Sequence, residues 1–151
     1  MNIIETTLTT QAVFSDDETK RYLLKKTWNT TLPKLAIIML APSIASGIEL
    51  DSTTSLVLNN ASALGFGSVS IVNLFATLGD FTLSEADSED PENLNAIVDA
   101  CKDADLIVYA PGVGKAKLQA FQERSKQVLE VLRPYEKKLK CLTSASGKAK
   151  L

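Results

Sequence analysis

The chain has 151 residues, of which 45% are hydrophobic and 23% charged. This composition is typical of one folded domain and unlike that of a disordered or low-complexity segment. The chain contains no histidine, which excludes a Ser-His-Asp triad, a Cys-His dyad and every histidine-ligated metal site. The formal net charge is -2, which disfavours a globally basic nucleic-acid-binding protein.

Cysteine usage and hydropathy bear on the compartment. Cys101 and Cys141 fit neither a CxxC motif nor a disulfide framework, so we expect buried, reduced thiols. The N-terminal residues lack the basic and apolar regions of a signal peptide. The longest apolar run, from Leu35 to Pro42, is far shorter than the roughly 20 residues that span a bilayer. We therefore expect a cytoplasmic protein without a membrane partner.

Residues 1–33 predict an N-terminal antiparallel β-hairpin. Thr-rich apolar stretches over 3–14 and a second β segment over 21–28 flank the polar turn 15–18. We expect the aromatic side chains of Tyr22 and Trp28 to pack across this hairpin, because two aromatic residues do not make a base-stacking platform.

Residues 34–151 predict an α/β core. Short apolar runs that are typical of strands buried on both faces recur at 35–41, 68–73, 105–110 and 139–143. Helical patterns fill the gaps, over 51–64, from Pro91 onward and over 118–132. Three successive strand–helix–strand units predict a three-layer sandwich with a mainly parallel central sheet flanked by helices. Since the chain shows no internal repeat and no linker, we expect residues 1–151 to form a single domain.

Charge is distributed unevenly along the core. Residues 80–105 hold nine acids and one base, whereas residues 115–151 hold ten bases and three acids. Both blocks can be solvated helix faces; alternatively, the basic block faces an anion. The acids Asp87, Glu89 and Asp90 stand at a predicted helix start and could suggest a magnesium site, but clustered acids there are more often favourable partners of the helix dipole. We expect no metal site and no cofactor.

The first candidate ligand-binding segment joins the first core strand to the first helix. Ligands of open parallel sheets bind outside the carboxyl ends of the strands, and this connection is longer than linkage alone requires. Its candidate ligand-binding residues are Ala41, Pro42, Ser43, Ser46, Asp51 and Thr53. They offer hydroxyls, a carboxylate and free backbone N–H groups, or they form a capped turn. Asn73, which ends the next strand, either contacts a base or sugar edge or holds the following loop.

A glycine turn is the second candidate. Gly112, Gly114 and Lys115 follow a strand and precede a helix, so their backbone amides can approach a phosphate. The turn is not a Walker A motif, because Tyr109 and Ala116 occupy its Gly and Ser/Thr positions. A plain tight turn is the alternative interpretation.

Several motifs in order resemble the domain-of-unknown-function family 1643. They are Arg21-Tyr22-Leu23-Leu24, Trp28, Ile38-Met39-Leu40-Ala41-Pro42-Ser43-x-Ala45, Asp51-x-Thr53 and Asn73-Leu74-Phe75-Ala76. The resemblance extends from Arg21 to the C-terminus. It implies a small single-domain protein of bacteria, their phages or mobile elements, and it implies no established activity.

The strand-ending Asn-Pro-Ser of that family is similar to the first motif of the uracil-DNA glycosylase superfamily. That motif holds an Asn or Asp near the scissile glycosidic bond, and the family's His-Pro ending is similar to the second motif. This chain departs from both, since Ala41 stands at the Asn position and residues 144–151 contain no His-Pro. It also reads Ala110-Pro111-Gly112 where the family tends to carry a tryptophan. The departures argue against glycosylase activity.

These observations favour a non-catalytic protein that binds a nucleotide-like or other anionic ligand, as a sponge, sensor or inhibitor of phage or mobile-element origin. The first alternative is a nucleoside, nucleotide or DNA N-glycosidase-like hydrolase, with Asp51 as the general base. Such a base would need a raised pKa or a nearby metal. The second alternative is a protein–protein interaction module with a host or phage partner. Nucleic acid is a less favoured ligand.

Overall fold

Seven strands form one sheet in the order β1-β2-β4-β3-β5-β6-β7, within a computed structural model that describes residues 1–43, 47–79, 89–143 and 149–150. The strands are β1 (Thr9–Phe14), β2 (Arg21–Thr27), β3 (Lys34–Met39), β4 (Ser68–Asn73), β5 (Leu106–Tyr109), β6 (Leu139–Thr143) and β7 (Ala149–Lys150). The helices are α1 (Ser52–Ala63), α3 (Pro91–Asp103), α4 (Gln119–Val131) and the 3-10 helix η1 (Arg133–Lys138). The prediction of a mixed α/β fold is confirmed.

The predicted N-terminal hairpin is present, and it continues the sheet. β1 and β2 pair antiparallel, and β2 in turn pairs antiparallel with β4. Strands β4, β3, β5 and β6 are mutually parallel, as the apolar runs predict. The sheet is therefore mixed, whereas the sequence predicts a mainly parallel one, because the hairpin joins the parallel strands through an antiparallel pairing of β2 with β4.

A β-bulge in β2 changes which side chains face each side of the sheet. Val13 pairs with Leu23 and Phe14 with Arg21, so Tyr22 has no residue opposite it. The extra residue shifts the alternation of side chains by one position. Strict alternation along β2 would place Arg21 on the same face as Lys25. Because of the bulge, Arg21 lies instead on the α1 side of the sheet, where it lines a cavity.

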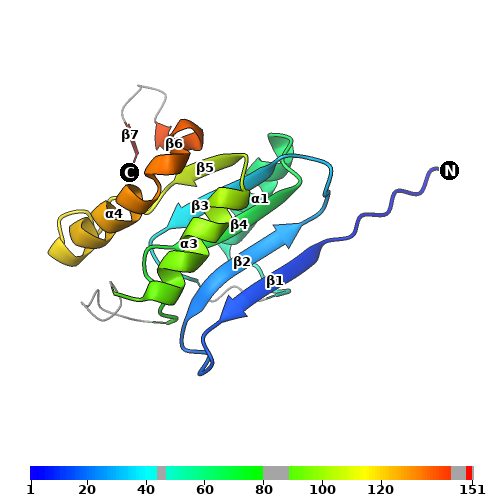
Figure 1. Ribbon diagram of the computed structural model, residues 1–151. Coiled ribbons are helices and arrows are strands. Elements are labelled where there is room, and N and C mark those ends of the chain that lie inside the picture. The colour runs from blue at the N-terminus through cyan, green and yellow to red at the C-terminus, as the bar shows by residue number, and fades with distance from the viewer. Residues whose placement is uncertain (44–46, 80–88, 144–148, 151) are drawn as a thin grey trace.

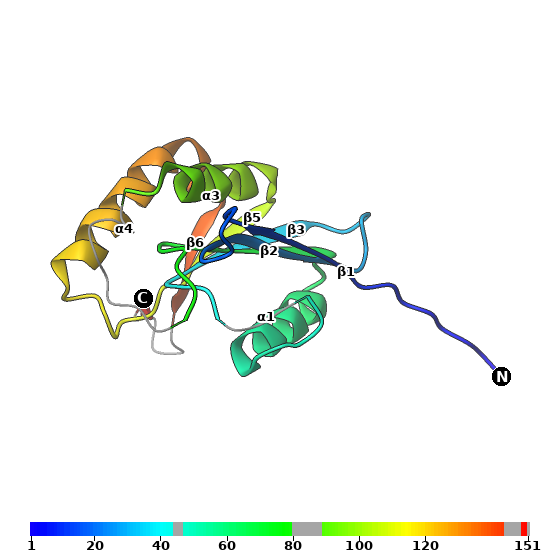
Figure 2. The ribbon, with the colours of Figure 1, turned by 90° about the horizontal axis from the view of Figure 1, so that it is seen from below.

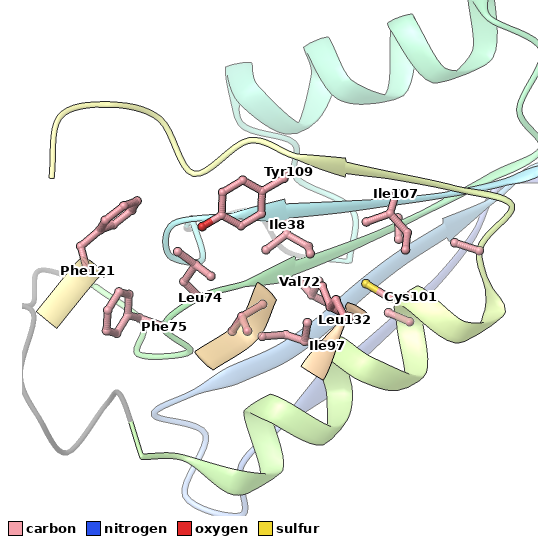
Figure 3. Close-up of a cluster of buried hydrophobic side chains, with 14 residues drawn as sticks. Ile38, Val72, Leu74, Phe75, Ile97, Cys101, Ile107, Tyr109, Phe121 and Leu132 are labelled. Atoms are coloured by element: carbon pink, nitrogen blue, oxygen red, sulfur yellow. The ribbon is translucent and has the colours of Figure 1, made fainter. Parts of the chain in front are cut away.

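The helices lie on opposite faces of the sheet, α1 on one side and α3 and α4 on the other (Figures 1 and 2). The α1 side buries one apolar cluster built around Leu24, Ile37 and Val69. The opposite side buries a larger cluster, in which Cys101 lies among side chains of the sheet, α3 and α4 (Figure 3). No helix in the described part of the chain is both long and apolar enough to cross a membrane.

Local signals start and stop the helices where the sequence predicts. The Asp51 carboxylate accepts the backbone N–H of Thr54 at 2.7 Å and caps α1, and Gly65 ends that helix with a φ of +85°. Pro91 opens α3 behind the capping residue Asp90. The expectation for Cys141 is wrong, because this residue is exposed. It lies on β6 near the edge of the sheet, where β7 adds only two residues.

Candidate functional site

The carboxyl ends of β3 and β4 and the first turn of α1 surround a cavity of about 90 Å³. Its lining residues are Arg21, Met39, Ala41, Ser43, Thr53, Thr54, Ile71 and Asn73. Four of the residues singled out in the sequence, Ala41, Ser43, Thr53 and Asn73, therefore meet at one cavity. They meet because β3 and β4 are parallel neighbours, with Met39 opposite Asn73 at their ends.

Arg21 places a buried positive charge in this cavity. The residue is 2% exposed, and its Nη1 donates a hydrogen bond to the Ser43 carbonyl oxygen at 3.3 Å. Burial lowers the pKa of Arg21, and the charge of Asp51 opposes that shift. Pattern reasoning alone did not mark Arg21 as a site residue, because only the bulge in β2 brings it to this face. The family motif that begins at Arg21 is the signal that could have found it.

Asn73 contributes a buried amide. The residue is 2% exposed, and its side-chain Oδ1 accepts no hydrogen bond from any described residue. A buried acceptor left unsatisfied costs about 1–3 kcal/mol, so a donor from a bound molecule would be favourable here. The alternative role, holding the loop, belongs to its main chain, whose carbonyl oxygen accepts the Asn93 Nδ2–H at 3.0 Å.

Two side chains from the far side of the sheet fix the turn that follows Asn73. Asn93, fully buried in α3, donates through Nδ2 to the carbonyl oxygens of Asn73 and Leu74. Arg124 of α4, which is 1% exposed, donates through Nε to the Leu74 carbonyl oxygen at 2.8 Å. The negative charge of Asp90 favours the charged form of Arg124. The main chain at Asn73 and Leu74 is thus held by a buried polar network.

Asp51 acts as the cap of α1 at the rim of the cavity. Burial would raise the pKa of its carboxyl, but hydrogen bonds from Thr54 and Ser43 and the charge of Arg21 lower it overall. A carboxylate that is already paired and easily ionised is a weak proton acceptor near neutral pH. The geometry therefore favours the capping role over that of a general base.

Lys26 is a second buried cation on the same face, and sequence reasoning missed it. The residue is 1% exposed, and its Nζ donates to Thr10 Oγ1 at 2.8 Å and to the Gly47 carbonyl oxygen at 2.6 Å. Burial lowers the pKa of Lys26, and the positive charge of Arg21 lowers it further. Lys26 is two residues from the core residue Leu24, so the period-2 alternation of a strand could have identified it as inward-facing.

The glycine turn lies apart from the cavity. Gly112, Gly114 and Lys115 are exposed in the connection from β5 to α4 and do not line it. They lie beyond the same edge of the sheet, because β5 runs parallel to β3. Gly112 has a φ of +78°, which explains the glycine by turn geometry alone. Of the remaining candidates, Pro42 is buried and Ser46 lies outside the described residues.

Two acids of the acidic block, Asp90 and Asp103, form ion pairs with lysines of the same chain. Lys20 pairs with Asp90 at 2.7 Å, and Asp103 pairs with Lys25 of β2 and Lys34 of β3. Asp90 caps α3, as a carboxylate at a helix start is expected to do, whereas Asp87 lies outside the described residues. In the described ranges no group of three or more Cys, Asp or Glu residues could hold a metal ion.

Comparison with known proteins gives one match. Neither the curated proteins nor the solved structures contain a significant match to the chain. The family described as "Protein of unknown function (DUF1643)" matches residues 21–150. The matched region begins at Arg21 and includes every residue that lines the cavity. The chain belongs to the DUF1643 family.

Proposed function

We propose that this protein binds a small nucleotide-like or other anionic ligand at the cavity beside α1, and that it does not convert the ligand. One observation carries the proposal: a buried guanidinium, Arg21, and an unsatisfied buried amide oxygen, Asn73 Oδ1, line the same small cavity. The amide oxygen is costly to bury without a hydrogen-bond donor, and the guanidinium brings a positive charge to the same cavity.

The hydrogen-bonding groups of the cavity define the chemistry of the ligand. Arg21 and the hydroxyl of Thr53 can donate, and Asn73 Oδ1 can accept. The first turn of α1 contains no acidic residue, so no side-chain carboxylate beyond the Asp51 cap offsets the positive end of its dipole. A matching ligand therefore carries acceptor oxygens together with an N–H or O–H. Nucleotides and protonated phosphates have both.

The size of the cavity limits what it can hold. About 90 Å³ accommodates one phosphate-sized or base-sized group and not a whole nucleotide. The remainder of a larger ligand would lie outside the carboxyl edge of the sheet. There the connection after β3 leads to α1 on one face and the connection after β5 leads to α4 on the other, an arrangement that commonly forms a ligand crevice. Lys115 and its glycines lie in the connection after β5.

The two alternatives have less support. A hydrolase would need an activated base, and the Asp51 carboxylate is instead bound to Thr54 and Ser43 with a lowered pKa. A protein-interaction module would use the acidic block, in which Asp90 and Asp103 already pair with lysines of the same chain. We further propose that the protein acts in the bacterial cytoplasm as a sponge, sensor or inhibitor. A distant likeness to the uracil-DNA glycosylase motifs is likewise a proposal.

Thermal unfolding with and without ligand tests the proposal. We would use inorganic phosphate, nucleosides, nucleoside monophosphates and short oligonucleotides as probes. A ligand at 100 times its Kd adds about 2.7 kcal/mol, which raises the Tm of a domain of this size by about 5–10 °C. Mass spectrometry of the same mixture shows whether the ligand is intact. A converted ligand would favour the hydrolase, and a panel without any shift would contradict the proposal.

Matched variants connect a shift to the cavity. Asn73→Asp places a second carboxylate beside Arg21, so we expect the ligand-induced shift to be lost. Asn59→Asp makes the same chemical change on an exposed part of α1 and should keep the shift. Each variant is compared with its own ligand-free Tm. A shift that Asn73→Asp retains in full would place the ligand elsewhere.

A further inference from the structure

The strand β1 forms an unprotected edge of the sheet. In the part of the chain that the structure describes, β1 pairs with β2 alone (Figure 1). An edge strand presents unpaired N–H and C=O groups, and proteins usually shield such an edge with lysine, proline, a bulge or a covering loop. The strand sequence Thr-Thr-Gln-Ala-Val-Phe contains no charged residue and no proline. The bulge in this strand pair belongs to β2, where Tyr22 is the extra residue, and it lies beside the C-terminal end of β1.

The opposite edge of the same sheet is built differently. β6 contains Lys140 and β7 contains Lys150. Lysines on an edge disfavour pairing with another strand, because pairing would desolvate them. The chain thus carries charge at one edge of the sheet and none along β1.

Apolar side chains follow the uncharged edge. Leu8 is 50% exposed, and Val13 and Phe14 are exposed to a similar degree. Ile3 and Ile4 are more exposed still, on an extended segment that continues the line of β1 away from the sheet (Figures 1 and 2). From Thr6 to Phe14 the chain has no charged side chain. Exposed β-branched and apolar residues without charge are typical of a strand that pairs with another strand.

We propose that β1 pairs antiparallel with β1 of a second copy of this chain, so that two seven-stranded sheets join around a two-fold axis. A second copy is the occupant that the charges favour. Acidic or basic partner strands would gain no ion pair along this edge, whereas an uncharged edge meets its own copy without like-charge repulsion. A two-fold axis through the sheet places residues of the same face opposite one another. The facing pairs then come from the Thr, Gln, Ala, Val and Phe residues of the strand, and pairs of β-branched and aromatic residues stabilise sheets.

The proposed interface lies next to the ligand cavity but does not depend on it. Thr10 of β1 donates through Oγ1 to the Gly47 carbonyl oxygen at 2.9 Å and accepts from Lys26. Pairing of β1 would therefore steady the strand that holds the connection between β3 and α1.

Light scattering on a size-exclusion column tests the proposal with the full chain. We expect a mass of twice 16.3 kDa for the unchanged protein. Thr9→Lys places a lysine on the edge and should give a monomer at the same concentration. The control is Thr27→Lys, because Thr27 lies directly opposite Thr9 on the internal strand β2. It should remain a dimer, and circular dichroism checks that both variants fold.

Hydrogen exchange provides a second test that needs no variant. Backbone amides of β1 that point away from β2 should exchange quickly in dilute protein and slowly in concentrated protein. Amides of β6 should show no such dependence. A mass of 16.3 kDa at every concentration, a Thr9→Lys variant that stays dimeric, or β1 exchange rates independent of concentration would each overturn the proposal.

Discussion

Asp90 connects the stability of the fold to the geometry of the cavity. Its carboxylate caps α3 by accepting the Asn93 N–H at 3.0 Å, and it pairs with Lys20 at 2.7 Å. Its charge also favours the buried, charged Arg124. Since Asn93 and Arg124 hold the turn after Asn73, we expect the Asp90→Ala change to weaken both the fold and the ligand site.

The size of the effect follows from these contacts. Loss of a helix N-cap costs about 1 kcal/mol. The Lys20 side chain is 31% exposed and can be solvated, so its pair contributes no more than about 1 kcal/mol. Loss of the favourable charge interaction between Asp90 and buried Arg124 adds to this. We expect Asp90→Ala to cost about 2–3 kcal/mol, and Asp90→Asn about 1 kcal/mol less, because Asn caps helices as well as Asp does.

Equilibrium urea unfolding at pH 7 measures both variants against the unchanged protein. A difference of about 1 kcal/mol between Asp90→Asn and Asp90→Ala would support the capping contribution. Equal destabilisation by the two variants would refute the capping argument. An Asp90→Asn variant as stable as the unchanged protein would show that the charge of Asp90 contributes nothing.

Three further measurements test the structure. Burial raises the pKa of the Asp90 carboxyl, but the hydrogen bonds that it accepts, with that from Lys20 the largest, lower it overall below its ordinary value of 3.8. As the pH falls, Asp90 is therefore protonated in the unfolded chain before it is protonated in the folded protein. The stabilisation is then complete above about pH 4 and is lost as the pH falls further, and urea midpoints between pH 2 and 5 should change less in Asp90→Asn. A thiol reagent at pH 8 should modify exposed Cys141 in the folded protein, whereas Cys101, whose pKa burial raises to about 12, should react only after unfolding. Ile97→Ala should cost about 2–5 kcal/mol in urea unfolding, because Ile97 is fully buried, and a cost under about 1 kcal/mol would contradict its place in the core.

Much of the fold could be predicted from local patterns. The continuous apolar run from Ser68 to Asn73 predicted a strand covered on both faces, and β4 is buried along its whole length. The caps at Asp51 and Gly65 and the proline at 91 depend only on neighbouring residues, so they too could be read from the sequence. The junction between β2 and β4 could not, because it joins segments far apart in the chain.

The site was only partly predictable for the same reason. Ala41, Ser43 and Asn73 could be grouped, because parallel strands place their carboxyl ends together. Arg21 could not, because its face depends on a bulge that adds one residue against β1. The glycine turn had the composition of a phosphate-binding loop, but nothing in its spacing indicated its distance from the cavity.

Two buried cations, Arg21 and Lys26, lie on the α1 side of the sheet. Removing a guanidinium and an ammonium from water costs free energy, and ion pairs and hydrogen bonds inside a protein often return no more than that cost. Arg21 and Lys26 lie close enough that the charge of Arg21 lowers the pKa of Lys26, and Asp51 is the acid whose charge acts on Arg21. A fold selected for stability alone would be served as well by apolar residues at these positions. A bound anion would supply negative charge to Arg21, which lines the cavity together with the unsatisfied Asn73 Oδ1, whereas Lys26 does not line it and donates to Thr10 and Gly47.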